Sequence, residues 1–229
     1  MKTYVWCEDS SSGYLFWKVL FNVIYPDFIV ETQNGNSRLS KAVEKIDDDG
    51  NMYYIILDTA IDNPDILREL KRLKRSAFGK NNIRIIKIHS FEFALLSFKF
   101  LEQWVFAEKD ELRDKRQKVL EARNIFINII NNGADSDILN EFKSVYEYQM
   151  KMNTEKISAR ILSEITKNTG FETNKTKIGS CFINNCCEWN ERKKDDICGL
   201  DYNRLTVTEK MKQIFKHSVL ELAFEEVGL

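Results

Sequence analysis

Acidic residues follow three apolar segments that are typical of β-strands. Glu8 and Asp58 each come directly after such a segment, and Glu92 lies shortly after a third. Reactive side chains of an open parallel sheet lie just beyond the carboxyl ends of its strands. If the strands before Glu8 and Asp58 are neighbours, the two carboxylates face one crevice. Oxygen ligands of this kind suit hard cations, so the pattern predicts a Mg²⁺ or Mn²⁺ site.

The same residues also have a purely structural explanation. Glu8 and Asp9 stand just before a helix pattern, where acidic residues are ordinary helix caps. Asp58 and Asp62 can equally be polar residues of a loop that leads to Pro64. From periodicity alone, both interpretations remain open.

The first half of the sequence alternates between strand and helix patterns. Strands are predicted at residues 3–7, 27–32, 52–57 and 83–88, and helices at about 14–24, 37–46, 64–78 and 91–106. The third strand is apolar throughout, which is typical of a parallel strand covered on both faces. The alternation predicts an α/β fold, a parallel sheet flanked by helices.

The sequence changes character after Ala107, because residues 108–118 carry nine charges. We expect an α/β domain at 1–107 and a mainly helical region at 108–229. Amphipathic patterns predict one long helix from the charged segment to about 130, others at about 138–152 and 157–165, and a last one. The last helix begins at a capping box, Thr206 to Glu209, with Leu222 on its inner face.

An irregular segment at 171–204 contains four of the five cysteines: Cys181, Cys186, Cys187 and Cys198. Four thiols in a short segment could bind Zn²⁺ tetrahedrally, although their spacing matches no standard zinc motif. The alternative is a core of buried thiols, held by Phe182, Ile183, Trp189, Ile197 and Leu200. Both interpretations stay open.

Two short stretches resemble the motifs of the Toprim domain. They are Val5-Trp6-Cys7-Glu8-Asp9 and Tyr54-Ile55-Ile56-Leu57-Asp58-Thr59-Ala60-Ile61-Asp62, and the resemblance covers about the first 105 residues. The Toprim domain is shared by topoisomerases, bacterial primases, overcoming-lysogenization-defect nucleases and related phage-defence nucleases. Two features differ from the usual family pattern: Asp9 stands where a Gly usually follows the Glu, and the two Asp residues are four positions apart rather than two.

The resemblance implies a Mg²⁺-dependent nuclease, an effector of phage defence. It implies that Glu8 is a general acid/base or metal ligand and Asp58 a Mg²⁺ ligand, with Asp62 or Glu92 completing the shell. Mg²⁺ would polarise the scissile phosphate and activate water. The alternative is a catalytically degenerate Toprim fold that acts as an adaptor for a partner protein. The sequence contains no Walker-type loop, so control by ATP would require a separate ATPase chain.

Basic residues on the helix predicted at 64–78 could contact a nucleic-acid backbone, of DNA or RNA, without reading its sequence. They are Arg68, Lys71, Arg72 and Arg75. The alternative is a solvated helix face on which Asp65 and Glu69 are the partners of these cations.

Overall charge and hydropathy bound the class of protein. The 34 Lys and Arg residues nearly balance 35 Asp and Glu residues, which excludes a uniformly basic nucleic-acid coat. No apolar run reaches the roughly 18 residues that span a bilayer, so we expect no membrane association. Acidic residues come early in the sequence, before any long apolar segment, which predicts a cytoplasmic protein without a secretory signal. The sequence does not indicate an oligomeric state.

Overall fold

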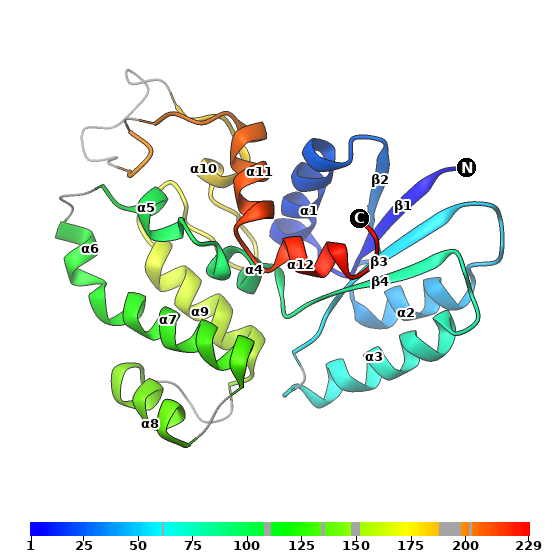
Figure 1. Ribbon diagram of the computed structural model, residues 1–229, viewed down its shortest axis with the longest axis horizontal. Helices are drawn as coiled ribbons and strands as arrows, with labels where there is room; N and C mark the ends of the chain where they lie inside the picture. Colours follow the sequence, from blue (N-terminus) through cyan, green and yellow to red (C-terminus); the bar gives the residue numbers. More distant parts are fainter. Residues whose placement is uncertain (61, 108–110, 134–135, 148–151, 188–197, 202) are drawn as a thin grey trace.

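The computed structural model describes residues 1–60, 62–107, 111–133, 136–147, 152–187, 198–201 and 203–229. Its first half forms a four-stranded parallel sheet in the order β2-β1-β3-β4 (Figure 1). The strands are β1 (Thr3–Cys7), β2 (Phe28–Thr32), β3 (Met52–Asp58) and β4 (Ile83–Ile88). The order makes β1 and β3 neighbours, which is the condition that brings Glu8 and Asp58 to one edge.

Helices cover both faces of the sheet, as the apolar β3 segment predicted. Tyr54 and Ile56 of β3 join the core formed with α1 (Ser11–Ile24). On the opposite face, Ile55 and Leu57 pack beneath α2 (Asn36–Glu44) and α3 (Pro64–Ala77). Burial of each such side chain contributes about 1.5–3 kcal/mol. The predicted α/β class is therefore confirmed, and β1 and β3 are the two interior strands of the sheet.

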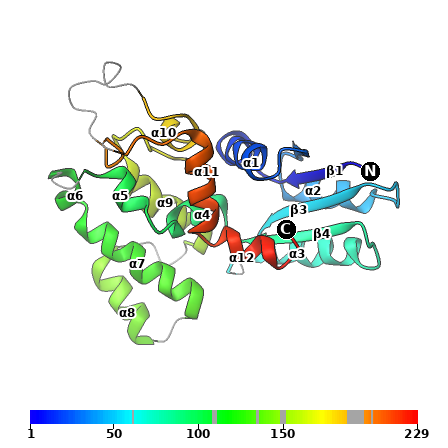
Figure 2. The same cartoon turned by 45° about the horizontal axis from the view of Figure 1, so that its top comes forward.

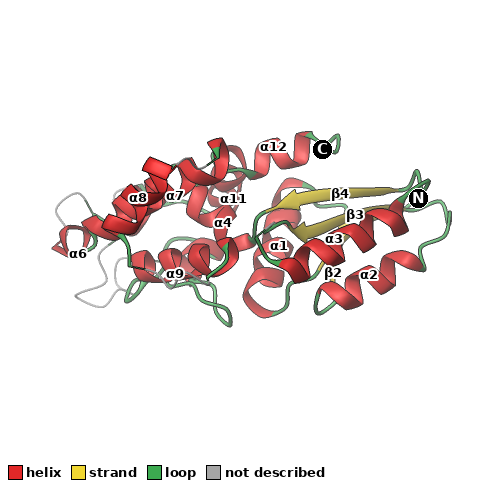
Figure 3. Cartoon of the chain, turned by 90° about the horizontal axis from the view of Figure 1, so that it is seen from below, coloured by secondary structure: helices red, strands yellow, loops and turns green. Residues whose placement is uncertain are grey.

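The rest of the chain is mainly helical and stands at the end of the sheet toward which the strands point (Figure 3). Its helices are α4 (Phe91–Ser97), α5 (Leu101–Val105), α6 (Glu111–Lys115), α7 (Gln117–Asn132), α8 (Ser136–Val145), α9 (Thr154–Thr166), α10 (Ser180–Ile183), α11 (Val207–Lys216) and α12 (Leu220–Glu225). The carboxyl edge of the sheet thus faces the helical half. Among the described residues, no helix is both long and apolar enough to cross a bilayer.

Three of the predicted helices are interrupted. The helix expected at 91–106 stops before Phe98, because the buried Arg123 side chain donates hydrogen bonds to the carbonyl oxygens of Leu96 (2.7 Å) and Phe98 (2.8 Å). The long helix expected after Ala107 divides at Arg116 into α6 and α7. The last helix divides into α11 and α12.

One prediction about the last helix is confirmed and another is wrong. The capping box is present, since the Thr206 hydroxyl accepts from the Glu209 N–H and the Glu209 carboxylate accepts from the Thr206 N–H. Leu222, expected to face inward, is 68% exposed. The reason is the break between α11 and α12, which changes the direction of the chain and turns the buried face of α12 to Leu220 and Phe224.

A single hydrophobic core runs from one face of the sheet into the helical half. Helix α11 packs against α1, and α12 returns to pack against the edge strand β4 (Figure 2). Helix α9 packs against both α4 and α7. The predicted segments 1–107 and 108–229 therefore share buried surface, and the position of the helical half relative to the sheet edge is fixed by packing.

Candidate functional site

Asp58 is the last residue of β3 and lies at the carboxyl edge of the sheet. Its side chain is 7% exposed, and its Oδ1 atom has no hydrogen-bond partner among the described residues. Burial raises the pKa of Asp58 well above the ordinary value, and the negative charges of Glu8 and Asp9 raise it further. A buried carboxylate oxygen without a partner is costly, and a cation would remove that cost.

Glu8 follows β1 and lies beside Asp58. Burial raises the pKa of Glu8 to about 8, the charge of Asp9 adds to this effect, and a hydrogen bond with Asp58 opposes it. The neighbouring carboxyl groups of Glu8 and Asp58 therefore hold a proton near neutral pH unless another positive charge replaces it. This exchange of proton for cation is the chemistry that a divalent ion site uses.

Asp9 is fixed by the first turns of α1. Trp17 Nε1 donates a hydrogen bond of 2.7 Å to Asp9 Oδ2, and the Thr32 hydroxyl donates to the Asp9 carbonyl oxygen. Burial raises the pKa of Asp9 to about 6, and the Trp17 hydrogen bond opposes the rise. The N-cap of α1 is Ser10, whose side chain makes no capping bond. Asp9 is thus held at the sheet edge through a side chain of the helix rather than as its cap.

Two further carboxylates come from helices that face the sheet edge. Glu92 lies in the first turn of α4, and burial raises its pKa to about 7. Glu155 lies in the first turn of α9. Burial is the largest cause of the raised pKa of Glu8, Asp9, Asp58 and Glu92, and the charge of Glu155 contributes in all four cases.

Sequence reasoning missed Glu155. An acidic residue in the first turn of a helix is ordinary, because it complements the helix dipole, so nothing local distinguishes it. The only signal available was that Asn153, Thr154 and Glu155 begin a helix that could pack at the sheet edge. The structure brings Glu8, Asp9, Asp58, Glu92 and Glu155 together as an acidic cluster, named here by these five residues.

Asp62 has a different environment from these five. It is exposed, and its Oδ2 accepts hydrogen bonds from the backbone N–H (2.6 Å) and the hydroxyl group (2.9 Å) of Thr154. It therefore connects the segment after β3 to the beginning of α9. Nearby, burial lowers the pKa of His89, the charge of Asp62 opposes this, and the buried Nδ1 has no partner among the described residues. A role for Asp62 as a metal ligand stays a prediction.

The residues of the acidic cluster fit a Mg²⁺ ion in one particular way. Among the described side chains, no group of three or more His, Cys, Asp or Glu residues is already arranged to hold a metal. Mg²⁺, however, usually keeps several waters and binds through one or two carboxylates together with oxygens of its substrate. The unpartnered oxygen of Asp58 and the adjacent Glu8 carboxyl group supply that number of oxygen ligands.

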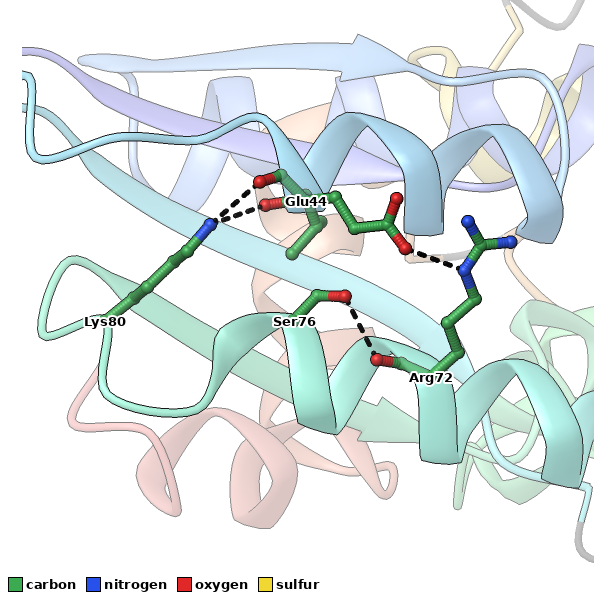
Figure 4. Close-up of polar contacts among 5 residues, drawn as sticks. Glu44, Arg72, Ser76 and Lys80 are labelled. Carbon is green, nitrogen blue, oxygen red and sulfur yellow. Dashed lines mark hydrogen bonds and ion pairs between the residues drawn. The ribbon is translucent and has the colours of Figure 1, made fainter.

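The basic residues of α3 divide into two groups. Arg72 pairs with Glu44 of α2 (Nε to Oε1, 2.8 Å), so it joins the two helices on this face (Figure 4). Arg68 forms an exposed ion pair with Asp65, and Lys71 and Arg75 are exposed. Helix α3 begins near the carboxyl edge, so Arg75, in its last turn, lies about 16 Å further along the helix axis than Pro64. Arg68 and Lys71 are therefore the residues of this set nearest to the acidic cluster.

Lys80, just after α3, also has a structural function. Its Nζ donates to the carbonyl oxygens of Val43 (3.1 Å), Glu44 (3.1 Å) and Ile46 (2.6 Å), and thereby satisfies the carboxyl end of α2. Figure 4 shows the bond to Glu44. Together with the ion pair of Arg72 and Glu44, this contact fixes α2 against α3. The basic face of α3 therefore packs against α2 in part and is exposed to solvent in part.

The four clustered cysteines are close enough to affect one another. Burial raises the pKa of Cys181 to about 11, and the charge of Cys198 raises it further. The charge of the buried Lys210 opposes the rise. Cys187 and Cys186 make smaller contributions that raise this pKa. Lys210 Nζ donates to the carbonyl oxygens of Cys181 (2.8 Å) and Asn184 (3.0 Å). Phe182 and Leu200 are buried, while Trp189 and Ile197 lie outside the described residues. Zinc binding stays a prediction, and so does the alternative of a thiol core.

No protein-family model matches the chain, and no curated protein or solved structure is significantly similar to it. Arguments about function therefore rest on the residues and their geometry. The strongest of these observations is the pair formed by Glu8 and the buried, partly unpartnered Asp58 at the carboxyl edge of the sheet.

Proposed function

We propose that this protein is a Mg²⁺-dependent nuclease of the Toprim type, which hydrolyses phosphodiester bonds of nucleic acid as an effector of phage defence. The observation that carries the proposal is the carboxyl group of Asp58, which is buried beside Glu8 with one oxygen unpartnered. A cation that binds there stabilises the fold, because it pairs with a carboxylate that is otherwise buried without a partner. Mg²⁺ is a cation that prefers carboxylate and phosphate oxygens.

Each residue would then have a distinct function. Asp58 offers its unpartnered oxygen as the ligand, and Glu8 or Glu92 supplies a second oxygen or a proton. When Mg²⁺ is bound, it polarises the scissile phosphate and lowers the pKa of a bound water. Of Glu8 and Glu92, the residue that is not a ligand would keep its proton, since burial raises the pKa of both, and would donate that proton to the leaving oxygen near neutral pH. The attacking water would give a proton to an ionised carboxylate of the acidic cluster and form the new bond to phosphorus, while the bond to the leaving oxygen breaks and that oxygen takes a proton.

The substrate backbone would approach from the side of α3. Arg68 and Lys71 are the exposed cations of that helix nearest to the sheet edge, and contacts of this type recognise phosphates of DNA or RNA alike. Control by ATP would come from a separate chain. The thiols of Cys7, Cys181 and Cys186 are free, which agrees with the reducing conditions of the cytoplasm, where we place this activity.

A second candidate function is an adaptor that keeps the Toprim fold without its catalysis. Two observations favour it. No ready three-ligand group is found among the described residues, and Asp62 is engaged by the first residue of α9. In this alternative, the acidic cluster would contact a partner protein rather than a cation.

A cleavage assay distinguishes the two functions. Purified protein is incubated with DNA and, separately, with RNA, in Mg²⁺, in Mn²⁺ and in chelator. We expect metal-dependent cleavage by the wild type, loss of at least a hundredfold in Glu8→Gln and in Asp58→Asn, and no further loss in the double variant, because both residues serve one mechanism. Asp27→Asn is the matched control, since Asp27 is an exposed carboxylate just before β2, at the opposite edge of the sheet from the acidic cluster.

The result that would decide for the adaptor is equally clear. If either of the two cluster variants cleaves as well as the wild type, or if the wild type cleaves neither DNA nor RNA in Mg²⁺ or Mn²⁺, the nuclease function is excluded. Circular dichroism of each variant shows whether a loss of activity reflects a loss of fold.

A further inference from the structure

The contact between Asp62 and the first turn of α9 joins the sheet edge to the helical half. We propose that Asp62 is a positioning residue, which docks the N-terminus of α9 and thereby holds Glu155 beside the cation site, where its charge supports the bound ion. This inference rests on the cation-dependent function proposed above. It assigns a residue of the helical half to a site that the sequence motifs place in the α/β half alone.

The hydrogen bonds at the start of α9 support the docking. Asp62 Oδ2 accepts from both the backbone N–H and the hydroxyl group of Thr154, at 2.6 and 2.9 Å. The N-cap residue Asn153 accepts from the Lys156 N–H at 3.0 Å. The first turn of a helix has four N–H groups without helical partners, so two acceptors here satisfy two of them and fix the helix end.

The docked helix end places Glu155 in a defined position. Glu155 directly follows Thr154, which Asp62 holds, and α9 packs along α4, the helix that carries Glu92. The acidic cluster includes Asp58, which is 93% buried and whose Oδ1 atom has no hydrogen-bond partner among the described residues. The charge of Glu155 adds to burial in raising the pKa of Asp58. The charge of Glu155 thus opposes the ionisation of Asp58, and a bound cation relieves this repulsion.

The geometry of Asp62 itself argues for positioning rather than ligation. The side chain is exposed, and the oxygen that accepts both bonds points to Thr154. An asparagine side chain also has an oxygen that accepts hydrogen bonds at helix N-termini, and it does so about as well as aspartate. Asp62→Asn therefore preserves docking but removes a charge, whereas Asp62→Ala removes both. Comparing the two variants therefore shows whether Asp62 positions α9 or binds the cation.

The first experiment measures Mn²⁺ binding to the full chain by calorimetry, with no nucleic acid present. We expect Glu155→Gln to weaken Mn²⁺ binding by about tenfold or more, a size typical of residues that support a metal site. Glu164→Gln is the matched control, because Glu164 lies on the same helix but pairs with Arg160 at the surface. We expect its Mn²⁺ affinity to equal that of the wild type.

The second experiment compares substitutions at the dock by the same calorimetry and by hydrogen exchange of the first turn of α9. Asp62→Ala should accelerate exchange there and weaken Mn²⁺ binding about tenfold or more. Asp62→Asn should retain slow exchange and most of the affinity. Thr154→Val, which removes only the hydroxyl group, should have a smaller effect of the same kind and serves where Asp62→Ala does not fold.

Each contrary result has a definite meaning. Wild-type Mn²⁺ binding that is unchanged in Glu155→Gln overturns the assignment of Glu155 while leaving the proposed function intact. Loss of affinity in Asp62→Asn with exchange still slow would make Asp62 a ligand and overturn its positioning function. Absence of Mn²⁺ binding in the wild type would overturn the proposed function and this inference together.

Discussion

The indole N–H of Trp17 donates a hydrogen bond of 2.7 Å to the carboxylate of Asp9, eight residues earlier in the chain. The bond crosses from the second turn of α1 to the segment that follows β1. The bond holds the Asp9 side chain in place at the carboxyl edge of the sheet. The sheet edge and the start of α1 therefore form one rigid unit.

This unit leaves no room for a side chain at Gly13. A Cβ atom there would come within 2.8 Å of the Asp9 Cβ and closer still to its carboxyl group, which Trp17 prevents from moving away. Helix propensity alone predicts that Gly13→Ala stabilises the protein by about 1 kcal/mol. We expect the opposite, a loss of about 1–3 kcal/mol, because the substitution overpacks a fixed site. Chemical denaturation measures the change, and a gain in stability would show that Asp9 can move.

The acidic cluster makes stability depend on pH. Burial, aided by the charge of Asp9, raises the pKa of Glu8 from 4.5 to about 8, so the folded chain holds this proton more tightly than the unfolded chain does. The stabilisation is complete below about pH 4.5 and is lost as the pH rises through about 8. In chelator, we expect the Tm of Glu8→Gln minus that of the wild type to increase between pH 5 and 8.5. The increase should be a few degrees, since 1 kcal/mol corresponds to about 2–4 °C at this size.

Mg²⁺ provides the control for this pH effect. A cation bound to the folded state stabilises it by mass action, so saturating Mg²⁺ at pH 8.5 should raise the Tm of the wild type more than that of Glu8→Gln. A Tm difference that is independent of pH and of Mg²⁺ would mean that Glu8 is solvated and outside any cation site.

The basic face of α3 predicts a graded effect on nucleic-acid binding. Arg68→Gln and Lys71→Gln should each weaken binding to duplex DNA, and each should reduce the slope of log affinity against log salt by about 0.9. Arg75→Gln should have less effect, because Arg75 lies at the far end of the helix. Lys216→Gln, an exposed cation on α11, is the control. Equal losses in all four variants would indicate nonspecific attraction rather than a bound position on α3.

Elemental analysis distinguishes a zinc site from a core of buried thiols at the four clustered cysteines. If Cys181, Cys186, Cys187 and Cys198 bind zinc, protein purified without added metal should contain about one zinc per chain, and Cys186→Ser should lose both the metal and protection from protease in this segment. If they form a thiol core, zinc should be far below one per chain. In that case Cys186→Ser should remain protected, because Phe182 and Leu200 already anchor the segment in the core.

Several elements could be predicted because their signals are local. The bounds of β4 agree with the apolar segment at 83–88, and β3 is longer than predicted by one residue, Asp58. Helix α3 begins at Pro64, as predicted, where a proline at the first turn loses no hydrogen bond. An apolar run, a cap or a proline acts within a few residues, so the sequence reveals it directly.

The failures arise where a distant residue competes with the local pattern. The apolar segment 91–106 satisfies every local rule for one helix, yet the buried Arg123 takes the carbonyl oxygens at the end of α4. Leu222 fits the inner face of a continuous helix and became exposed when that helix divided. No local pattern contains either event, because both depend on side chains that arrive from elsewhere in the chain.

The candidate site also combines features that are set locally with features that depend on distant contacts. The sequence by itself determined that Glu8 and Asp58 stand at the ends of strands, because strand ends are set by local composition. Only the tertiary structure decided that β1 and β3 are adjacent, that Asp62 meets Thr154 across 92 positions, and that Glu155 joins the acidic cluster. The contacts of Thr154 and Glu155 accompany the packing of α9 on α4. Such packing is selected by the buried surface of the whole core, and no short stretch of sequence specifies it.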